Sequence, residues 1–275
     1  MFQKILIANR GEIALRILRA CRELNIKTVA IHSEADESAM HVRMADESVC
    51  VGPASVQSSY LNIPAIITAA TITNVDAIHP GYGFLSENQR FAEITEEHNI
   101  KFIGPNSQHI KMMGNKISAR KIMKDNNVPI VPGLNDISDK NKIKQFIDRT
   151  ELPIIIKAAS GGGGKGMRII KDYSELDKSI NAAKLEAKKS FNDDTVYIEK
   201  FLTSPKHIEI QILSDSYGNV VTLGERDCSI QRRLQKLIEE TPSPFMTEKL
   251  RNAMGDSAVK AAKAVKYEGV GTIEF

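Results

Sequence analysis

The hydrophobic positions of the first hundred residues form two alternating kinds of segment. Short, almost continuous apolar runs predict buried β-strands, and the longer runs between them repeat apolar residues with the spacing of a helix. The predicted strands are residues 4–8, 28–32, 48–51, 77–78 and 101–103, and the predicted helices are residues 12–24, 38–44, 61–71 and 87–98. Strands and helices that alternate at this spacing predict a parallel sheet with helices on both faces.

After residue 105 the pattern favours hairpins over strand–helix units. Residues 107–126 have the spacing of one helix, and residues 128–133, with two prolines and a glycine, are typical of a linker at a domain boundary. The further predicted strands are residues 154–157, 167–170, 195–200, 207–214, 219–224 and 271–275, and the further helices are residues 139–148, 173–189 and 248–266. Residues 225–233 are polar and charged, so we expect them to lie outside the strands.

The most unusual pattern is in residues 154–170, where two β-branched runs flank a loop with five glycines in six positions. Successive N–H groups in a glycine-rich loop can form a concavity that binds a phosphate, and Lys157 and Lys165 add positive charge beside it. The loop is not a Walker A loop, because its lysine precedes the last glycine and Met167 follows. It is not a dinucleotide fingerprint either, because it lies between two strands. The pattern therefore predicts a phosphate-covering flap, and a flexible hairpin tip or linker is the alternative.

Composition and charge exclude several classes of function. The 275 residues give room for two domains, and 42% apolar and 26% charged residues are ordinary for a soluble protein. The net charge of +3, without basic runs interleaved with aromatic residues, argues against nucleic-acid binding, and no apolar run suits a membrane. Three cysteines without C-x-x-C spacing indicate reduced thiols and no zinc site. We therefore expect a cytoplasmic protein with neither a nucleic-acid nor a membrane partner.

Two features of the chain's ends modify this picture. The first predicted turn, residues 8–12 (ANRGE), lacks the glycine pair that holds a pyrophosphate, so the parallel sheet does not indicate NAD. The last residues, 271–275 (GTIEF), have an apolar strand pattern with no polar tail. We expect the chain to be part of a longer polypeptide, and to fold poorly and be inactive alone, because its last strand would lack neighbours.

Five motifs together carry a resemblance that extends over the whole chain. They are residues 8–13 (ANRGEI), 79–88 (HPGYGFLSEN), 161–167 (GGGGKGM), 207–211 (HIEIQ) and 225–233 (ERDCSIQRR). In this order they closely resemble biotin carboxylase, the ATP-grasp subunit or domain of biotin-dependent carboxylases. The resemblance implies an α/β fold with a Rossmann-like domain at residues 1–113, a linker helix at 114–130, an ATP-grasp lid with the glycine loop at 131–202, and an incomplete C-terminal ATP-grasp domain at 203–275.

The activity that the resemblance implies is a ligase reaction. Such enzymes use ATP, Mg²⁺ (or Mn²⁺) and bicarbonate to form carboxyphosphate, whose CO₂ carboxylates biotin on a biotin carboxyl carrier protein. The implied partners are this carrier and carboxyltransferase subunits, in an acetyl-CoA carboxylase of fatty acid biosynthesis. A homodimer through the N-terminal domain is also implied, because Arg16, Arg19 and Glu23 resemble the family's dimer surface; a solvated helix face is the alternative. The rival functions are another ATP-grasp ligase, such as a carbamoyl-phosphate synthetase or a purine-pathway carboxylase, and a non-enzymatic nucleotide-binding or assembly module.

The resemblance also implies roles for individual residues. Lys116 and Lys157 would contact the nucleotide phosphates and Lys236 would contact bicarbonate, which makes these three lysines the expected catalytic residues. Glu274 would be the first of two magnesium carboxylates, and Glu87 would line the site. The remaining implied ATP-binding residues are Gly161, Gly162, Gly163, Gly164, Lys165, Gly166, Met167, Glu199, Lys200, Leu202, His207 and Gln231, among which Glu199 and Lys200 resemble the adenine-binding hinge.

The sequence departs from the family pattern in two places. Leu234 stands where many relatives have a histidine after the double arginine, which puts a ribose contact there in doubt. The family's second magnesium carboxylate and its catalytic arginine and glutamate near bicarbonate and biotin are expected beyond Phe275. The chain is therefore expected to contain much of an ATP site and only part of a carboxylation site.

Overall fold

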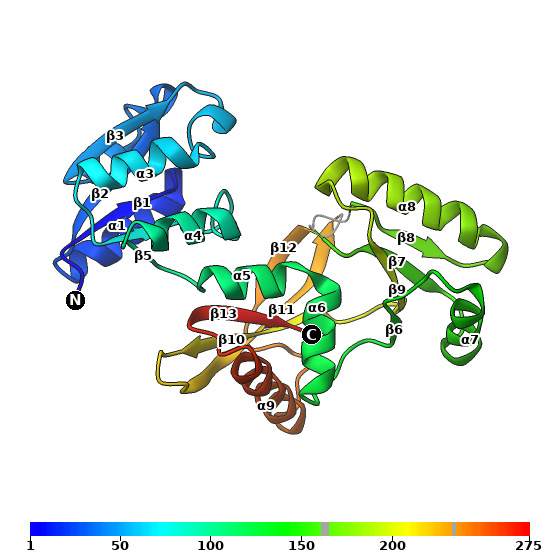
Figure 1. Cartoon of the computed structure of the whole chain (residues 1–275). Helices are drawn as coiled ribbons and strands as arrows, with labels where there is room; N and C mark the ends of the chain where they lie inside the picture. The colour runs from blue at the N-terminus through cyan, green and yellow to red at the C-terminus, as the bar shows by residue number, and fades with distance from the viewer. Residues whose placement is uncertain (161–164, 233–234) are drawn as a thin grey trace. The chain divides into compact units, whose positions relative to one another are not determined.

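A computed structural model of the protein describes residues 1–160, 165–232 and 235–275 (Figure 1). The chain divides into two compact units, Met1–Lys111 and Met112–Phe275, and each has its own hydrophobic cores. The predicted divisions after residues 113, 130 and 202 stay predictions about the domains. No helix among the described residues is both long enough and apolar enough to cross a bilayer.

The first unit is built on a five-stranded sheet in the order β3-β2-β1-β4-β5, in which every paired strand is parallel. Its strands are β1 (Lys4–Ile7), β2 (Lys27–Ser33), β3 (Glu47–Gly52), β4 (Ala77–His79) and β5 (Lys101–Phe102). Its helices are α1 (Gly11–Glu23), α2 (Met40–Met44), α3 (Ile63–Ile72) and α4 (Gln89–Glu97). The α/β fold predicted from the alternating pattern is thus confirmed.

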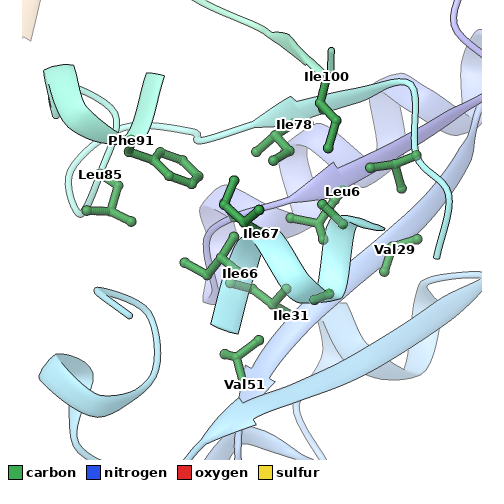
Figure 2. Packing of buried hydrophobic residues seen from close by; sticks show 14 of the residues in the cluster. Leu6, Val29, Ile31, Val51, Ile66, Ile67, Ile78, Leu85, Phe91 and Ile100 are labelled. Carbon is green, nitrogen blue, oxygen red and sulfur yellow. The ribbon is translucent and has the colours of Figure 1, made fainter. Parts of the chain in front are cut away.

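Helices cover both faces of this sheet. Successive side chains of a strand point to opposite faces, so an all-apolar strand has apolar side chains to bury on each face. Ile5 and Ile7 pack with residues of α1, and Leu6 between them packs in the other core with Ile66 of α3 and Phe91 of α4. Figure 2 shows this second core closing around Leu6. Each fully buried side chain of this size contributes about 1.5–3 kcal/mol, so two such cores hold the strands firmly in register.

The second unit contains two antiparallel sheets. The first has the order β6-β9-β7-β8, and the second has the order β12-β11-β10-β13. The strands are β6 (Gly133–Leu134), β7 (Ile154–Ala158), β8 (Arg168–Ile170), β9 (Val196–Lys200), β10 (Ile208–Ser214), β11 (Val220–Arg232), β12 (Gln235–Glu240) and β13 (Gly269–Glu274). The helices are α5 (Ser107–Gly114, across the boundary of the units), α6 (Lys116–Asp125), α7 (Lys140–Thr150), α8 (Leu176–Phe191) and α9 (Glu248–Ala264).

Each sheet of the second unit is covered by helices that were predicted from the sequence. The helices α7 and α8 pack on the first sheet through a core of isoleucine and alanine side chains (Figure 1). The helix α9 packs on the second sheet, where Ala258 and Ala262 contact Ile210 and Ile212. Small residues on α9 let the helix lie close to the strands, so these apolar strand residues are buried although the chain has few aromatics.

Three expectations from the sequence were wrong in detail. The predicted helix 107–126 is two helices, because Asn115 leaves the helical conformation and its side chain accepts the N–H of Ser118 to start α6. The polar residues 225–232 belong to β11, and β12 was not predicted at all. The last strand does not lack a neighbour, because β13 pairs with β10 from Gly269 to Glu274.

Candidate functional site

Two of the five sequence motifs meet in the first unit. The side-chain amide of Asn9, just after β1, donates to the carbonyl oxygens of Pro80 (2.8 Å) and Tyr82 (2.9 Å), which follow β4. Gly81 has φ +65°, and a Cβ there would lie 2.6 Å from the side chain of Ile13. The turn after β1 therefore holds the glycine-rich loop after β4 in one conformation, which explains why the two motifs occur together.

In the second unit, three cations surround one buried carboxylate. This Glu199 cluster consists of Lys116 and Arg120 on α6, Lys157 on β7 and Glu199 on β9. The Lys157 Nζ lies 2.5 Å from one carboxylate oxygen of Glu199, and Arg120 pairs with the other oxygen. The Glu199 side chain is only 7% exposed, and the Arg120 side chain 12%. One carboxylate therefore stands against three cations, which leaves the cluster with a net charge of +2.

Backbone contacts join the start of α6, which carries Lys116, to the end of β7, which carries Lys157. The N–H of Lys116 donates to the carbonyl of Ala159, directly after β7, at 3.0 Å, and Asn115 pairs with Ser160. Burial lowers the pKa of Lys116, and the positive charge of Lys157 lowers it further, against the opposing effect of Glu199. Two ammonium groups held this close repel one another, and a polyanion bound between them would remove that repulsion.

A second group of charged residues lies across β10, β12 and β13. This Glu274 cluster consists of His207, Glu209, Lys236 and Glu274. The Glu274 Oε1 lies 3.0 Å from the Lys236 Nζ and 3.4 Å from the His207 Nε2. Lys236 also pairs with Glu209, whose side chain is 4% exposed. Ligand atoms of His207, Glu209 and Glu274 all lie within 4.8 Å of one another, so the cluster has the dimensions of a cation site.

Opposite charges fix the protonation states of this cluster. Burial opposes the charged form of Lys236, but its hydrogen bonds to Glu209 and Glu274 outweigh burial and raise its pKa. Burial acts to raise the pKa of the Glu209 carboxyl group. The ion pairs of Glu209 with Lys236 and with Arg226, the latter at 2.6 Å, have the larger effect, so the pKa of Glu209 is lowered. At neutral pH Lys236 is therefore a cation and Glu209 an anion. A permanent cation can hold a small anion such as a carboxylate or a carbonate.

The hydrogen bonds of His207 and Gln231 connect this cluster to β11. The Gln231 Nε2 lies 2.8 Å from the His207 Nδ1 and donates to the Cys228 carbonyl at 2.8 Å. The backbone N–H of His207 donates to the Ser229 hydroxyl at 3.0 Å. The His207 ring is therefore oriented with its Nε2 toward Glu274. Cys228 is fully buried, and burial, followed by Glu209, raises the pKa of its thiol to about 11, so the thiol stays protonated.

The polar strand β11 is stable because its buried charges have partners. The Arg251 guanidinium donates to both carboxylate oxygens of Glu225, with distances of 2.6 and 2.9 Å. Asp227 accepts the Ser229 hydroxyl at 2.5 Å and the Ser243 hydroxyl at 2.7 Å. The charged residues that seemed to argue against a strand are thus the ones that fix β11 to α9 and to the segment after β12.

The glycine-rich loop lies only partly within the described residues. Gly161, Gly162, Gly163, Gly164 and Leu234 lie outside them, so the predictions made for these five stay untested. Lys165 is exposed, and Met167 is half-buried. Gly166 has φ +70°, and a Cβ there would lie 3.1 Å from the Ala158 side chain. The end of the loop therefore packs on the last residue of β7 in a backbone conformation that favours glycine.

Three further predicted site residues are members of neither cluster. The Lys200 Nζ donates to the Glu151 carbonyl at 3.0 Å, and Leu202 is 49% exposed just after β9. Glu87 is exposed in the turn before α4, in the first unit. Their proposed parts in the site stay predictions.

Sequence reasoning missed two residues that the structure places at the centre of the clusters. Arg120 follows Lys116 by one helical turn, so the i, i+4 spacing on α6 was a signal for it. Glu209 is a charged residue between Ile208 and Ile210, and a glutamate buried in an apolar strand needs partners. The partners of Glu209 follow from the strand register, which places it opposite both Arg226 and Glu274. The partner of Arg120 follows from the position of α6 beside β9, and neither can be found from the sequence.

Comparison with known proteins decides the family. A family model described as biotin carboxylase, N-terminal domain, matches residues 1–110, and one described as carbamoyl-phosphate synthase L chain, ATP binding domain, matches residues 115–275. A biotin carboxylase from Haemophilus influenzae is 55% identical over 100% of this chain. The chain belongs to the biotin carboxylase family. It spans 62% of the length of that relative.

Other relatives differ in the carboxylase to which they belong. A pyruvate carboxylase subunit from Methanothermobacter thermautotrophicus is 51% identical over 100% of the chain, which covers 56% of that protein. A solved biotin carboxylase complex from Campylobacter jejuni has a TM-score of 0.96 at 50% identity, and the chain covers 62% of it. A biotin carboxylase domain from Hydrogenobacter thermophilus, solved with MgADP, ADP and bicarbonate, has a TM-score of 0.93 at 47% identity, with 61% covered. The predicted ATP-grasp biotin carboxylase fold is thereby confirmed.

Proposed function

We propose that the complete gene product uses ATP and bicarbonate to carboxylate biotin on a carrier protein. The observation that carries this proposal is the Glu199 cluster, in which the charges of Lys116 and Lys157 act on one another beside a buried carboxylate. Lysine is a point charge on a flexible stem, which suits the oxygens of a nucleotide phosphate. The bound MgADP of the Hydrogenobacter relative supports the same ligand here.

The donor set of the Glu274 cluster fits a magnesium ion. Mg²⁺ binds one or two carboxylates together with phosphate oxygens, and Glu274 and Glu209 offer carboxylate oxygens within 4.8 Å of each other. Glu274 is the better ligand, because both oxygens of Glu209 are already engaged by Arg226 and Lys236. When bound, the ion would neutralise charge on the phosphates during transfer. The same site could accept Mn²⁺, which also prefers oxygen ligands.

The proposed reaction begins with attack of a bicarbonate oxygen on the γ-phosphorus of ATP, which forms carboxyphosphate and releases ADP. Lys236, held as a cation by Glu209 and Glu274, would bind and orient bicarbonate. Lys116 and Lys157 would neutralise the charge that develops on the transferred phosphoryl group. Carboxyphosphate would then break into CO₂ and inorganic phosphate. The ureido nitrogen of biotin would form a bond to the carbon of CO₂ and give up its proton to the released phosphate.

The finer assignments of the proposal rest on the family alone. We propose Glu199, Lys200 and Leu202 at the adenine, His207 and Gln231 at the nucleotide, and Glu87 at the rim of the site. We further propose a cytoplasmic enzyme that dimerises through its first unit and works with a biotin carboxyl carrier protein and a carboxyltransferase. An acetyl-CoA carboxylase of fatty acid biosynthesis is the proposed assembly. The relatives also include subunits of pyruvate and propionyl-CoA carboxylases.

The test is ATP cleavage by the complete gene product with and without its proposed co-substrates. We expect ADP release to require bicarbonate and to increase when free biotin is added. Cleavage stimulated by ammonia or glutamine but not by biotin would favour a carbamoyl-phosphate synthetase, the rival that shares the family model of the second unit. Absence of bicarbonate-dependent cleavage, with ATP still bound, would instead favour a nucleotide-binding module without this activity.

A further inference from the structure

A second basic site in the second unit is a cavity of about 680 Å³. The cavity is lined by α6, by the segment from Ile130 to Asn135 and by the end of α7. Small-molecule sites in proteins have volumes of about 300–1,000 Å³, so this cavity has the size of a ligand site. None of the residues proposed above for ATP, bicarbonate or magnesium lines it.

Three exposed cations line this cavity. Lys121 and Lys124 extend from α6, and Arg149 extends from the last turn of α7. Among the residues that the structure describes, none of these three forms an ion pair, whereas Lys140 and Lys142 at the other end of α7 both do. Asp125 is the only carboxylate among the described residues of the lining, so it and the three exposed cations together have a net charge of +2.

Other residues of the lining are apolar, or their polar groups already have hydrogen-bond partners. Phe146 and Leu134 supply apolar surface that packs on the core of the first sheet. Arg120 also lines the cavity, and its Nη groups are engaged by Glu199 and, at 2.7 Å, by the Val131 carbonyl. The charge available to a ligand therefore comes from the three exposed cations, and the apolar surface would contact an uncharged part of the same ligand.

We infer that this cavity binds a small organic phosphate, with its phosphate between Lys121, Lys124 and Arg149 and its apolar part against Phe146. A phosphate monoester carries between one and two negative charges at neutral pH, which matches the net charge of the three exposed cations and Asp125. Arginine binds phosphate through two parallel N–H donors, and lysines add point charges. The inference does not depend on the proposed reaction, because Lys121, Lys124 and Arg149 have no part in the proposed binding of ATP, bicarbonate or magnesium. Arg120 is shared with the Glu199 cluster, and its Nη groups are already engaged.

The test uses phenyl phosphate as the probe and saturation-transfer NMR as the readout, on the complete gene product. All proteins carry Lys157→Met, which weakens phosphate binding at the Glu199 cluster, so that the signal reports on the cavity. We expect phenyl phosphate to bind, inorganic phosphate to compete with it, and benzoate, with a single charge, to bind more weakly. In Lys121→Glu/Lys124→Glu we expect binding to weaken at least about tenfold, and Arg149→Gln should weaken it in the same direction.

The matched control is Lys144→Glu, which reverses one charge on α7 outside the cavity lining. We expect it to leave the affinity for phenyl phosphate within about twofold, since exposed charges at a distance are screened. Equal binding by the Lys121→Glu/Lys124→Glu protein and its parent would overturn the inference. So would an equal loss in Lys144→Glu, because the probe would then follow net charge and not this cavity. Thermal unfolding of each variant shows that it is folded.

Discussion

Replacing Lys157 by methionine in the complete gene product is expected to lower bicarbonate-dependent ATP cleavage about 10²- to 10³-fold. This corresponds to roughly 2.7–4 kcal/mol of transition-state stabilisation, the usual loss when one preorganised donor is removed. The Lys157 ammonium is positioned by Glu199 at 2.5 Å and by its place in a buried strand, so it need not reorganise when phosphate binds. Steady-state release of ADP at saturating bicarbonate measures the effect.

Lys171→Met is the matched control for this substitution. Lys171 follows β8, is exposed, and has no ion pair among the described residues, so its loss removes the same charge without touching the cluster. We expect its turnover to stay within about twofold of the unmodified protein. Unchanged bicarbonate-dependent turnover in Lys157→Met would refute the role given to this lysine, and an equal loss in both variants would show a general effect of charge.

Glu199→Gln is expected to destabilise the second unit by about 3 kcal/mol. Breaking a buried ion pair by removing one partner costs about 3–5 kcal/mol, because the other charge stays buried without compensation. Here the substitution leaves the Arg120 guanidinium, 12% exposed, without the carboxylate with which it pairs. The thermal midpoint of the complete gene product should fall by about 6 °C or more, and added ATP should recover part of the loss because it supplies the missing negative charge.

Glu186→Gln tests whether burial is the cause of that loss. Glu186 pairs with Arg168 at 2.6 Å, but the two side chains are 34% and 41% exposed. An exposed pair is worth about 0–1 kcal/mol, so the midpoint should change by no more than about 2 °C. A drop in Glu186→Gln as large as that in Glu199→Gln would contradict the argument. The double variant Arg120→Met/Glu199→Met should be more stable than Glu199→Met, since it removes the uncompensated arginine.

Local pattern predicted the first unit well because its strands and helices bury apolar residues at regular spacing. Ile5, Leu6 and Ile7 already show which residues face each helix layer once a parallel sheet is assumed. The second unit was harder, because part of its stability comes from charged residues whose partners are distant in sequence. Glu225 is buried against Arg251, 26 residues later, and nothing local indicates that a charged segment can continue strand β11.

In the candidate site, too, some residues could be predicted from the local sequence, and others depend on partners that are distant in the sequence. Lys157 was predicted from the residues themselves, because a cation that ends a buried strand before a glycine loop is unusual. Lys116 and Lys236 were implied only by the family motifs, since a lysine on a helix or near a strand is normally solvated. Arg120 and Glu209 were not predicted, because their importance comes from strand register and helix packing, which bring Glu199 and Lys236 to them.

The central claim is that the Glu199 cluster binds the phosphates of a nucleotide. A crystal structure of the complete gene product with Mg²⁺ and a non-hydrolysable ATP analogue tests it most directly. The account predicts the Nζ atoms of Lys116 and Lys157 at about 2.7–2.9 Å from phosphate oxygens, with the metal ion bound to Glu274. Triphosphate bound away from the Nζ atoms of Lys116 and Lys157, with no metal ion at Glu274, would contradict it.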